Sequence, residues 1–189
     1  MAIFSGRTEV LSLDCPGGKY FFCAKRWRPL IKIWMDYFEI HGIVLGIGQD
    51  DEYKPENEAV MKHYPAITEL YSVDFKPFKI DKKGIVWDIC RPFFGNHNWV
   101  DFIICNAVLE HVIDPFGAMK NLTDILVPGG LMFIFTVGPG APYHRYPIDC
   151  YRFYRDVFIE YAKEFNLKIE DMAFPDSSCF IVYRKNELN

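Results

Sequence analysis

Short apolar segments that alternate with amphipathic ones constrain this chain more than any other feature of its sequence. Buried strands are expected at 43–48, 67–75, 84–90, 99–108 and 130–137, and helices at 25–42, 55–66, 115–126 and 156–166. Nearly all-apolar strands between helices are typical of a parallel sheet that is covered on both faces. The pattern therefore predicts a doubly wound, mostly parallel α/β sheet.

The C-terminal segment departs from this alternation. Strands are expected at 167–174 and 177–185, with only a short turn between them. A parallel pair needs a crossover of about a dozen residues, so these two strands should form an antiparallel hairpin at one edge. We divide the chain into an N-terminal extension (1–40) with one amphipathic helix that Gly42 stops, and an α/β domain (41–189).

Overall charge gives little reason to expect a nucleic-acid partner, because the formal net charge is −4 and the pI is about 5.7. Residues 15–35 contain five basic side chains and no acid. A solvated helix face explains this segment more simply than a site for an anionic partner. The N-terminus lacks a signal-peptide core, and no segment has the roughly 18–20 apolar residues of a membrane span. We expect a soluble, cytoplasmic protein.

The six cysteines do not form a metal-binding pattern. None belongs to a Cys-x-x-Cys pair, and no histidine follows at zinc-finger spacing. Cys90 and Cys105 end apolar runs, which favours packed, reduced thiols over disulfides. The sequence predicts no metal site.

Informative residues follow the strands, because parallel α/β sheets bind ligands at the carboxyl ends of their strands. Gly46 and Gly48 form a turn after the first strand, and Asp74 and Asp88 end the second and third. A carboxylate after the second strand suits a ribose diol, and one after the third suits an adenine amino group. A single aspartate at such a place is more often a turn or cap residue. Two in this order behind a Gly-x-Gly turn favour a nucleoside ligand.

Acidic residues after the glycine turn discriminate between nucleoside cofactors. Asp50, Asp51 and Glu52 stand where the pyrophosphate of a dinucleotide would lie. Like charges about 4 Å apart repel by roughly 4 kcal/mol at an effective dielectric constant near 20. S-adenosylmethionine has no phosphate and carries a cationic sulfonium and ammonium. An acidic turn therefore favours S-adenosylmethionine, and a nicotinamide cofactor comes second.

Residues 43 to about 170 resemble the small "type 11" class I S-adenosylmethionine-dependent methyltransferases. The most specific stretch is VDFIICNAVLEHVIDPFGAMKNLTDILVPGGLMFIFTV (100–137), which includes a Leu-Glu-His-Val turn and a Pro-Gly-Gly before the next strand. PYHRYPIDCYRFY (142–154) is similar to a His…Pro-x-Asp-x-x-Arg-Phe pattern of members associated with sugar or cell-surface polysaccharide genes. The resemblance implies S-adenosyl-L-methionine as cofactor.

Carried over by position, the resemblance implies that Gly48 bends around the methionine part of the cofactor and Asn106 lies beneath the methyl donor. The full cofactor-binding set is Gly46, Ile47, Gly48, Asp50, Asp74, Phe75, Asp88, Ile89 and Asn106. Two positions depart from the family. Gly46 stands where an acid is usual, and Asp50 stands where a second glycine is usual. These departures keep open a second hypothesis, a binding protein that retains the fold and has lost turnover.

Methyl transfer from a sulfonium mainly requires alignment, and a base is needed only for a protonated nucleophile. His144 and His111 are the candidate bases because imidazole titrates near neutral pH, with Asp149 as the group that orients His144. A structural or cofactor-shielding role is the stronger reading for His111.

The loop at 138–152 is expected to contact the acceptor. The candidate substrate-binding residues are Tyr143, Arg145, Tyr146 and Arg152, although Arg152 equally suits a loop anchor. We expect a small-molecule or sugar-like acceptor with an oxygen or nitrogen nucleophile. The chain has no inserted substrate domain, so the N-terminal helix, this loop and the second subunit of a homodimer are the sources of an acceptor site.

Overall fold

The computed structural model describes residues 28–48, 60–78, 84–145 and 147–187. The acidic cluster at 50–52, Tyr146 and the first five residues of the helix expected at 55–66 lie outside these residues. Within the described part of the chain, no helix is both long and apolar enough to cross a membrane.

A seven-stranded sheet forms the centre of the molecule, in the order β3-β2-β1-β4-β5-β7-β6. The strands are β1 (Gly42–Ile47), β2 (Ile67–Asp74), β3 (Gly84–Val86), β4 (Val100–Asn106), β5 (Leu126–Val137), β6 (Leu167–Ala173) and β7 (Ser178–Lys185). The first five are parallel, whereas β7 runs antiparallel to both β5 and β6. The predicted mostly parallel α/β sheet with a C-terminal antiparallel hairpin is confirmed.

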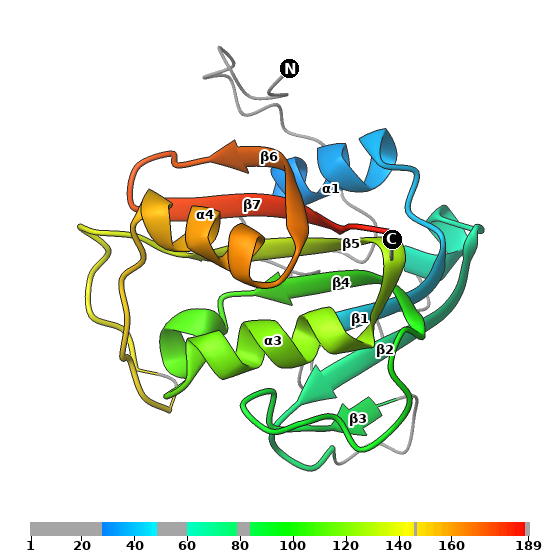
Figure 1. The fold of residues 1–189 in the computed structure, drawn as a ribbon, viewed down its shortest axis with the longest axis horizontal. Coiled ribbons are helices and arrows are strands. Elements are labelled where there is room, and N and C mark those ends of the chain that lie inside the picture. The colour runs from blue at the N-terminus through cyan, green and yellow to red at the C-terminus, as the bar shows by residue number, and fades with distance from the viewer. Residues whose placement is uncertain (1–27, 49–59, 79–83, 146, 188–189) are drawn as a thin grey trace.

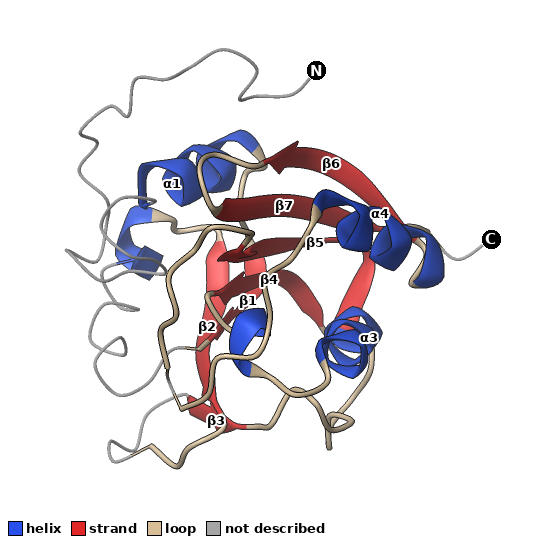
Figure 2. Ribbon diagram, turned by 90° about the vertical axis from the view of Figure 1, so that its left-hand side faces the viewer, coloured by secondary structure: helices blue, strands red, loops and turns tan. Residues whose placement is uncertain are grey.

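Helices cover both faces of this sheet (Figures 1 and 2). Those whose bounds lie within the described residues are α1 (Arg28–Tyr37), the 3-10 helix η2 (Leu109–His111), α3 (Pro115–Ile125) and α4 (Arg155–Glu164). Figure 2 shows the sheet between α1 on one side and α3 and α4 on the other. Two separate apolar cores correspond to these faces. Met119 and Phe158 belong to the core under α3 and α4, and Trp34 and Met35 belong to the core under α1.

Helix α1 ends earlier than its sequence predicts. The expected stop was Gly42, but the last helical residue is Tyr37, and Glu39 adopts a left-handed conformation (φ 51°). The Ile40 N–H then donates to the carbonyl of Met35, which closes the helix end. Apolar spacing does not reveal such a local reversal of the backbone. Because residues 1–27 lie outside the described part, the division at residue 40 stays a prediction.

Helix α1 is also tied to the far end of the chain. The indole N–H of Trp34 donates to Asp171 Oδ2 on β6 at 3.0 Å, and both side chains are buried. Burial of an ionised carboxylate is costly unless it is hydrogen-bonded. Asp171 Oδ1 accepts a second bond from its neighbour's backbone N–H. The N-terminal helix and the C-terminal hairpin therefore stabilise each other.

Two other boundaries differ from expectation. Strand β3 contains three residues, and β5 begins at Leu126, four residues before the predicted start at Gly130. In the early part of β5, Gly129 has φ 80°. The register of the β4–β5 pairing shifts there, between Val100 and Phe102 of β4. Pairing with a neighbouring strand extends β5 through a Pro-Gly-Gly segment that reads as a turn in the sequence.

Candidate functional site

A cavity of about 700 Å³ opens at the carboxyl ends of β1, β2 and β3, beside the residues that follow β4. The strand order reverses between β1 and β4, which is where open α/β sheets bind ligands. A volume of this size is within the range of small-molecule and cofactor sites. Its lining residues are Ile47, Gly48, Val73, Asp74, Phe75, Trp87, Asp88, Ile89, Cys90, Arg91, Val108, His111, Val112, Ile113, Asp114, Pro147 and Ile148.

Gly48 occupies a position that a side chain would obstruct. Its φ is +80°, and a Cβ atom would lie 2.4 Å from Cγ2 of Val108 and 3.3 Å from the carbonyl oxygen of Asn106. The Gly48 N–H donates to the carbonyl of Val73 at 2.9 Å, which holds the turn against β2. The turn after β1 therefore lies close to the segment after β4, and the chain approaches the cavity here with backbone alone.

Asp74 and Asp88 come from neighbouring strand ends and both line the cavity. Each uses one carboxylate oxygen to accept from the backbone N–H two residues later, at 2.9 Å to Lys76 and 3.0 Å to Cys90. These short turns fix the direction of each side chain. The structure thus brings together the two aspartates that the sequence pattern selected, next to Gly48.

Three other predicted cofactor residues, Ile47, Phe75 and Ile89, also line the cavity. Gly46 does not, because it is buried within β1, where it pairs with Ser72 and Ile104. Asn106 ends β4 and is not a lining residue. Among the described residues its Oδ1 atom is buried without a hydrogen-bond partner, and the next residue, Ala107, has φ 51°. Orphaned polar atoms and left-handed non-glycine residues concentrate at functional sites.

The cavity has a negative electrostatic character. Its described lining contains three aspartates, of which Asp114 caps α3 through the Gly117 N–H, and one cationic side chain, Arg91. Trp87 and Ile89, which are nearly buried, contribute apolar surface. A cationic nucleoside with an apolar base matches this combination better than a diphosphate, because each added negative charge would meet the aspartates. The residues present therefore fit S-adenosylmethionine.

The loop at 138–154 is organised by an ion pair between Asp149 and Arg152. Both guanidinium NH groups donate to this carboxylate, and Arg152 also donates to the carbonyls of Ala141 and Pro142. Arg152 hydrogen bonding holds the pKa of Asp149 well below its usual range. Arg152 therefore anchors the loop, which was one of its two predicted roles.

The Asp149 carboxylate binds the backbone N–H of His144 rather than its imidazole ring. The His144 N–H donates to Asp149 Oδ2 at 2.7 Å, whereas the ring Nδ1 lies 3.8 Å from the same oxygen. That distance is too long for a hydrogen bond to the ring. Arg145 donates to the carbonyl of Pro147 at 2.7 Å, and Tyr143 is exposed. Within the described residues, none of these side chains lines the cavity, although Pro147 and Ile148 do.

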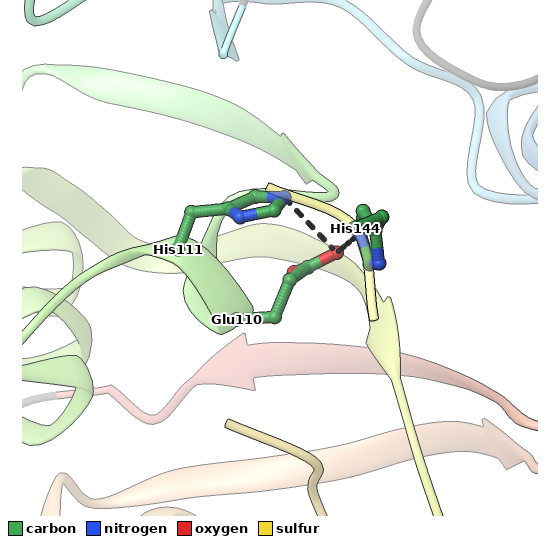
Figure 3. Close-up of side chains that lie close together, drawn as sticks. All are labelled: Glu110, His111 and His144. Atoms are coloured by element: carbon green, nitrogen blue, oxygen red, sulfur yellow. Dashed lines mark ion pairs between the residues drawn. The ribbon is translucent and has the colours of Figure 1, made fainter. Parts of the chain in front are cut away.

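Glu110 is the functional candidate that sequence reasoning missed. It lies in η2, is fully buried, and accepts from the Thr136 hydroxyl through Oε2 at 2.7 Å. Its other oxygen, Oε1, has no hydrogen-bond partner among the described residues and faces Nε2 of His144 at 3.7 Å and Nε2 of His111 at 3.9 Å (Figure 3). The ring centroids of His111 and His144 lie 4.9 Å apart. The Leu-Glu-His-Val turn was the only available signal, and it does not reveal which way the carboxylate points.

Comparisons with known proteins identify the family of this chain. The family model described as a methyltransferase domain matches residues 34–170. A 48-residue part of the chain is 42% identical to the ubiquinone biosynthesis O-methyltransferase of Parvibaculum lavamentivorans. That part covers 25% of this chain and 19% of the relative, so the chain matches about a fifth of that protein's length.

Solved structures share the fold at low sequence identity. An S-adenosylmethionine-dependent methyltransferase from Mesorhizobium loti has a TM-score of 0.64 at 12% identity, covering 84% of this chain and 97% of that one. A 1,6-didemethyltoxoflavin-N1-methyltransferase from Burkholderia thailandensis, with bound S-adenosylhomocysteine, has a TM-score of 0.62 at 14% identity, covering 85% and 78%. The [4+2]-cyclase SpnF has a TM-score of 0.61 at 11% identity, covering 85% and 82%.

The family match extends from helix α1 to β6 and includes the cavity at the strand ends. S-adenosylmethionine is the methyl donor of this family, and the site chemistry derived above fits it independently. The chain belongs to the methyltransferase domain family and carries a class I S-adenosylmethionine-dependent methyltransferase domain.

Proposed function

We propose that this protein transfers a methyl group from S-adenosylmethionine to an oxygen or nitrogen atom of a small-molecule or sugar-like acceptor. The observation that carries the proposal is the convergence of Gly48, Asp74 and Asp88 on one cavity at the strand-order reversal. Glycine at 48 permits close approach of a ligand, and the two aspartates match a ribose diol and an adenine amino group. The same pair would repel the pyrophosphate of a nicotinamide cofactor.

S-adenosylmethionine supplies a methyl group on a cationic sulfur, and the protein's task is to orient it. Asp74 and Asp88 would hold the nucleoside through charge-assisted hydrogen bonds, while Trp87 and Ile89 would cover the base. Holding donor and acceptor in line contributes roughly 7–11 kcal/mol to such displacements. Asn106, whose Oδ1 atom is buried and unpaired among the described residues, is a candidate partner for the polar end of the methionine part.

An acceptor hydroxyl must lose its proton during the transfer. His111 lines the cavity, and His144 lies against it with its ring centroid 4.9 Å away. The Glu110 carboxylate faces both imidazole Nε2 atoms, and Asp149, the predicted orienting group, accepts from the His144 backbone N–H. We propose that this group of three side chains promotes the loss of that proton. Tyr143, Arg145 and Tyr146 remain candidates for acceptor contact from the adjoining loop.

Isothermal titration calorimetry with S-adenosylhomocysteine tests the cofactor assignment directly. We expect one site per chain in the full-length protein, with affinity reduced in Asp74→Asn. Reduced nicotinamide dinucleotide, added to the same protein as a control, should produce neither heat nor a fluorescence change. Absence of heat at millimolar S-adenosylhomocysteine would refute the proposal.

A binding or scaffolding protein without turnover is the second candidate function. Its support is Gly46, which stands where related domains usually carry an acid, together with Asp50 in place of a glycine. The [4+2]-cyclase with the same fold illustrates that this architecture also serves other chemistry. One measurement distinguishes the two candidates: the release of S-adenosylhomocysteine in the presence of a panel of hydroxyl and amine acceptors. Binding of S-adenosylmethionine without release of S-adenosylhomocysteine for any acceptor would support the second candidate.

A further inference from the structure

Three potential electron-pair donors converge beside the cavity. They are Oε1 of Glu110 and the Nε2 atoms of His111 and His144, all within 4.8 Å of one another (Figure 3). Glu110 is fully buried, and its Oε1 atom has no hydrogen-bond partner among the described residues. A buried carboxylate oxygen without a partner normally costs several kcal/mol, so a positive group is expected next to it. The Arg152 guanidinium interacts electrostatically with Glu110, but among the described residues Oε1 has no hydrogen-bond partner.

Hydrogen bonds on the outer side of each ring decide which nitrogen faces inward as an acceptor. Nδ1 of His111 contacts the carbonyl oxygen of Ile148, and Nδ1 of His144 lies 3.2 Å from that of Pro142. A carbonyl can only accept, so the proton of each neutral imidazole lies on Nδ1. In the neutral rings, both Nε2 atoms therefore present lone pairs to Glu110. The same arrangement, with a backbone carbonyl behind the ring, orients histidines that bind metal ions.

The distances from Glu110 Oε1 to the two Nε2 atoms distinguish three arrangements: a direct hydrogen bond, a bridging water molecule and a bound metal ion. The Nε2–Oε1 distances of 3.7 and 3.9 Å exceed the roughly 2.7–3.2 Å of a direct hydrogen bond from a protonated ring. A water molecule with two bonds of about 2.8 Å at a tetrahedral angle would space its partners about 4.6 Å apart. Ligands about 2.1 Å from a tetrahedral zinc ion lie about 3.4 Å apart. The two Nε2–Oε1 distances are nearest to the last arrangement, and all three atoms lie within 4.8 Å of one another, a wider spacing than a tetrahedral ion needs.

We propose that Glu110, His111 and His144 bind a single divalent transition-metal ion of the zinc, cobalt, manganese or iron class. Two imidazoles and one carboxylate are ligands that this class prefers, and three protein ligands leave at least one coordination position open. Thr136 holds the other carboxylate oxygen and so fixes the orientation of the ligand. The sequence predicted no metal site because the third ligand is 33 residues beyond the second and follows no zinc-binding spacing.

The free coordination position of the metal ion can take the acceptor hydroxyl, a role that rests on the proposed function. His111 lines the cavity, so an acceptor hydroxyl there can coordinate the ion, which lowers the pKa of the bound hydroxyl. The hydroxyl proton passes to solvent, and the oxygen lone pair forms the bond to the methyl carbon. The carbon–sulfur bond breaks with its electron pair remaining on sulfur. The products are a methyl ether, S-adenosylhomocysteine and one proton, and no oxidant or reductant is required.

Cobalt(II) is the probe, because a four- or five-coordinate site gives visible d–d absorption independent of activity. Full-length protein without an affinity tag, purified in the presence of a chelator, is titrated with cobalt chloride. We expect one equivalent to bind and zinc to displace it. His144→Ala and Glu110→Gln should each weaken cobalt binding at least about 100-fold. His97→Ala, a change at an exposed histidine outside the cavity, is the matched control and should bind as the wild type does.

Titration without d–d bands in the wild type would overturn the proposal, as would binding that Glu110→Gln and His144→Ala leave unchanged. Circular dichroism and S-adenosylhomocysteine calorimetry on the same variants establish that they fold, and His144 is partly exposed, so its truncation is well tolerated. The calorimetry also separates the two proposals. Glu110→Gln should lose cobalt and keep S-adenosylhomocysteine, whereas Asp74→Asn should show the reverse.

Discussion

Replacement of Gly48 by alanine tests how closely the turn after β1 approaches the segment after β4. The backbone at φ +80° costs a non-glycine residue about 1–3 kcal/mol. The new Cβ would lie 2.4 Å from Cγ2 of Val108, far inside the roughly 3.5–4.0 Å of ordinary carbon contact. Overpacking of this kind costs a further 1–3 kcal/mol, roughly. Gly48→Ala should therefore lower the free energy of unfolding by about 2–6 kcal/mol.

A double-mutant cycle with Val108→Ala separates these two causes. Truncation of Val108 removes Cγ2, so Gly48→Ala should cost only the backbone part, about 1–3 kcal/mol, in that background. The measurement is urea denaturation of the wild type, the two single variants and the double variant. S-adenosylhomocysteine calorimetry on the same four proteins reports the effect on the site.

The outcome that contradicts this reasoning is specific. If Gly48→Ala costs the same with valine or alanine at 108, the close contact between the two segments is wrong. If Gly48→Ala matches the wild type in both free energy of unfolding and ligand affinity, the turn does not border the ligand. The proposed cofactor site would then be wrong.

Three further predictions concern other parts of the molecule. Asp74→Asn keeps the oxygen that accepts from the backbone but loses the charge, so S-adenosylhomocysteine affinity should fall by roughly 10- to 150-fold in calorimetry, with no such fall for the exposed Asp156→Asn. Arg152 depresses the pKa of Asp149, so the stability that this pair gives the loop is complete above about pH 4 and declines as the pH falls further. Amide hydrogen exchange at His144 should rise in that acid range, and Asp149→Asn should show the raised exchange already at pH 7. Trp34→Phe leaves a buried carboxylate with one bond fewer and should lower the free energy of unfolding by about 1–3 kcal/mol in urea denaturation; an unchanged midpoint would contradict the role given to this bond.

Most strands and helices were predictable because their signal is local. The apolar runs at 43–47 and 100–106 are long enough to bury on both faces, and the proximity of β6 and β7 in sequence excludes a parallel crossover. Errors arose where local pattern and tertiary contact disagree. The early start of β5 depends on pairing with β4, and the early end of α1 depends on a left-handed residue, Glu39.

The candidate site divides in the same way. Asp74 and Asp88 could be selected because strand ends of a parallel sheet gather at one edge, and the structure places both on the cavity; their roles toward a ligand stay predictions. The orienting role given to Asp149 stays a prediction. Its carboxylate accepts from the His144 backbone N–H and lies 3.8 Å from the ring Nδ1, and the structure also places Glu110 3.7 Å from Nε2 of the same ring. Glu110 is separated by 26 residues from the hydroxyl that holds it, so no spacing rule could have selected it.

The sequence by itself determined the class of fold, the edge of the sheet where the cavity opens and the sign of the charge that lines it, because periodicity and strand-end chemistry are properties of neighbouring residues. Tertiary structure alone decided which donors meet. The direction of the Glu110 carboxylate, the carbonyl contact of the His111 ring and the 3.7 and 3.9 Å gaps depend on contacts between η2, β5 and the loop at 138–154. Such contacts form only when segments far apart in the chain pack together, and burial then gives an unpaired oxygen its chemical consequence.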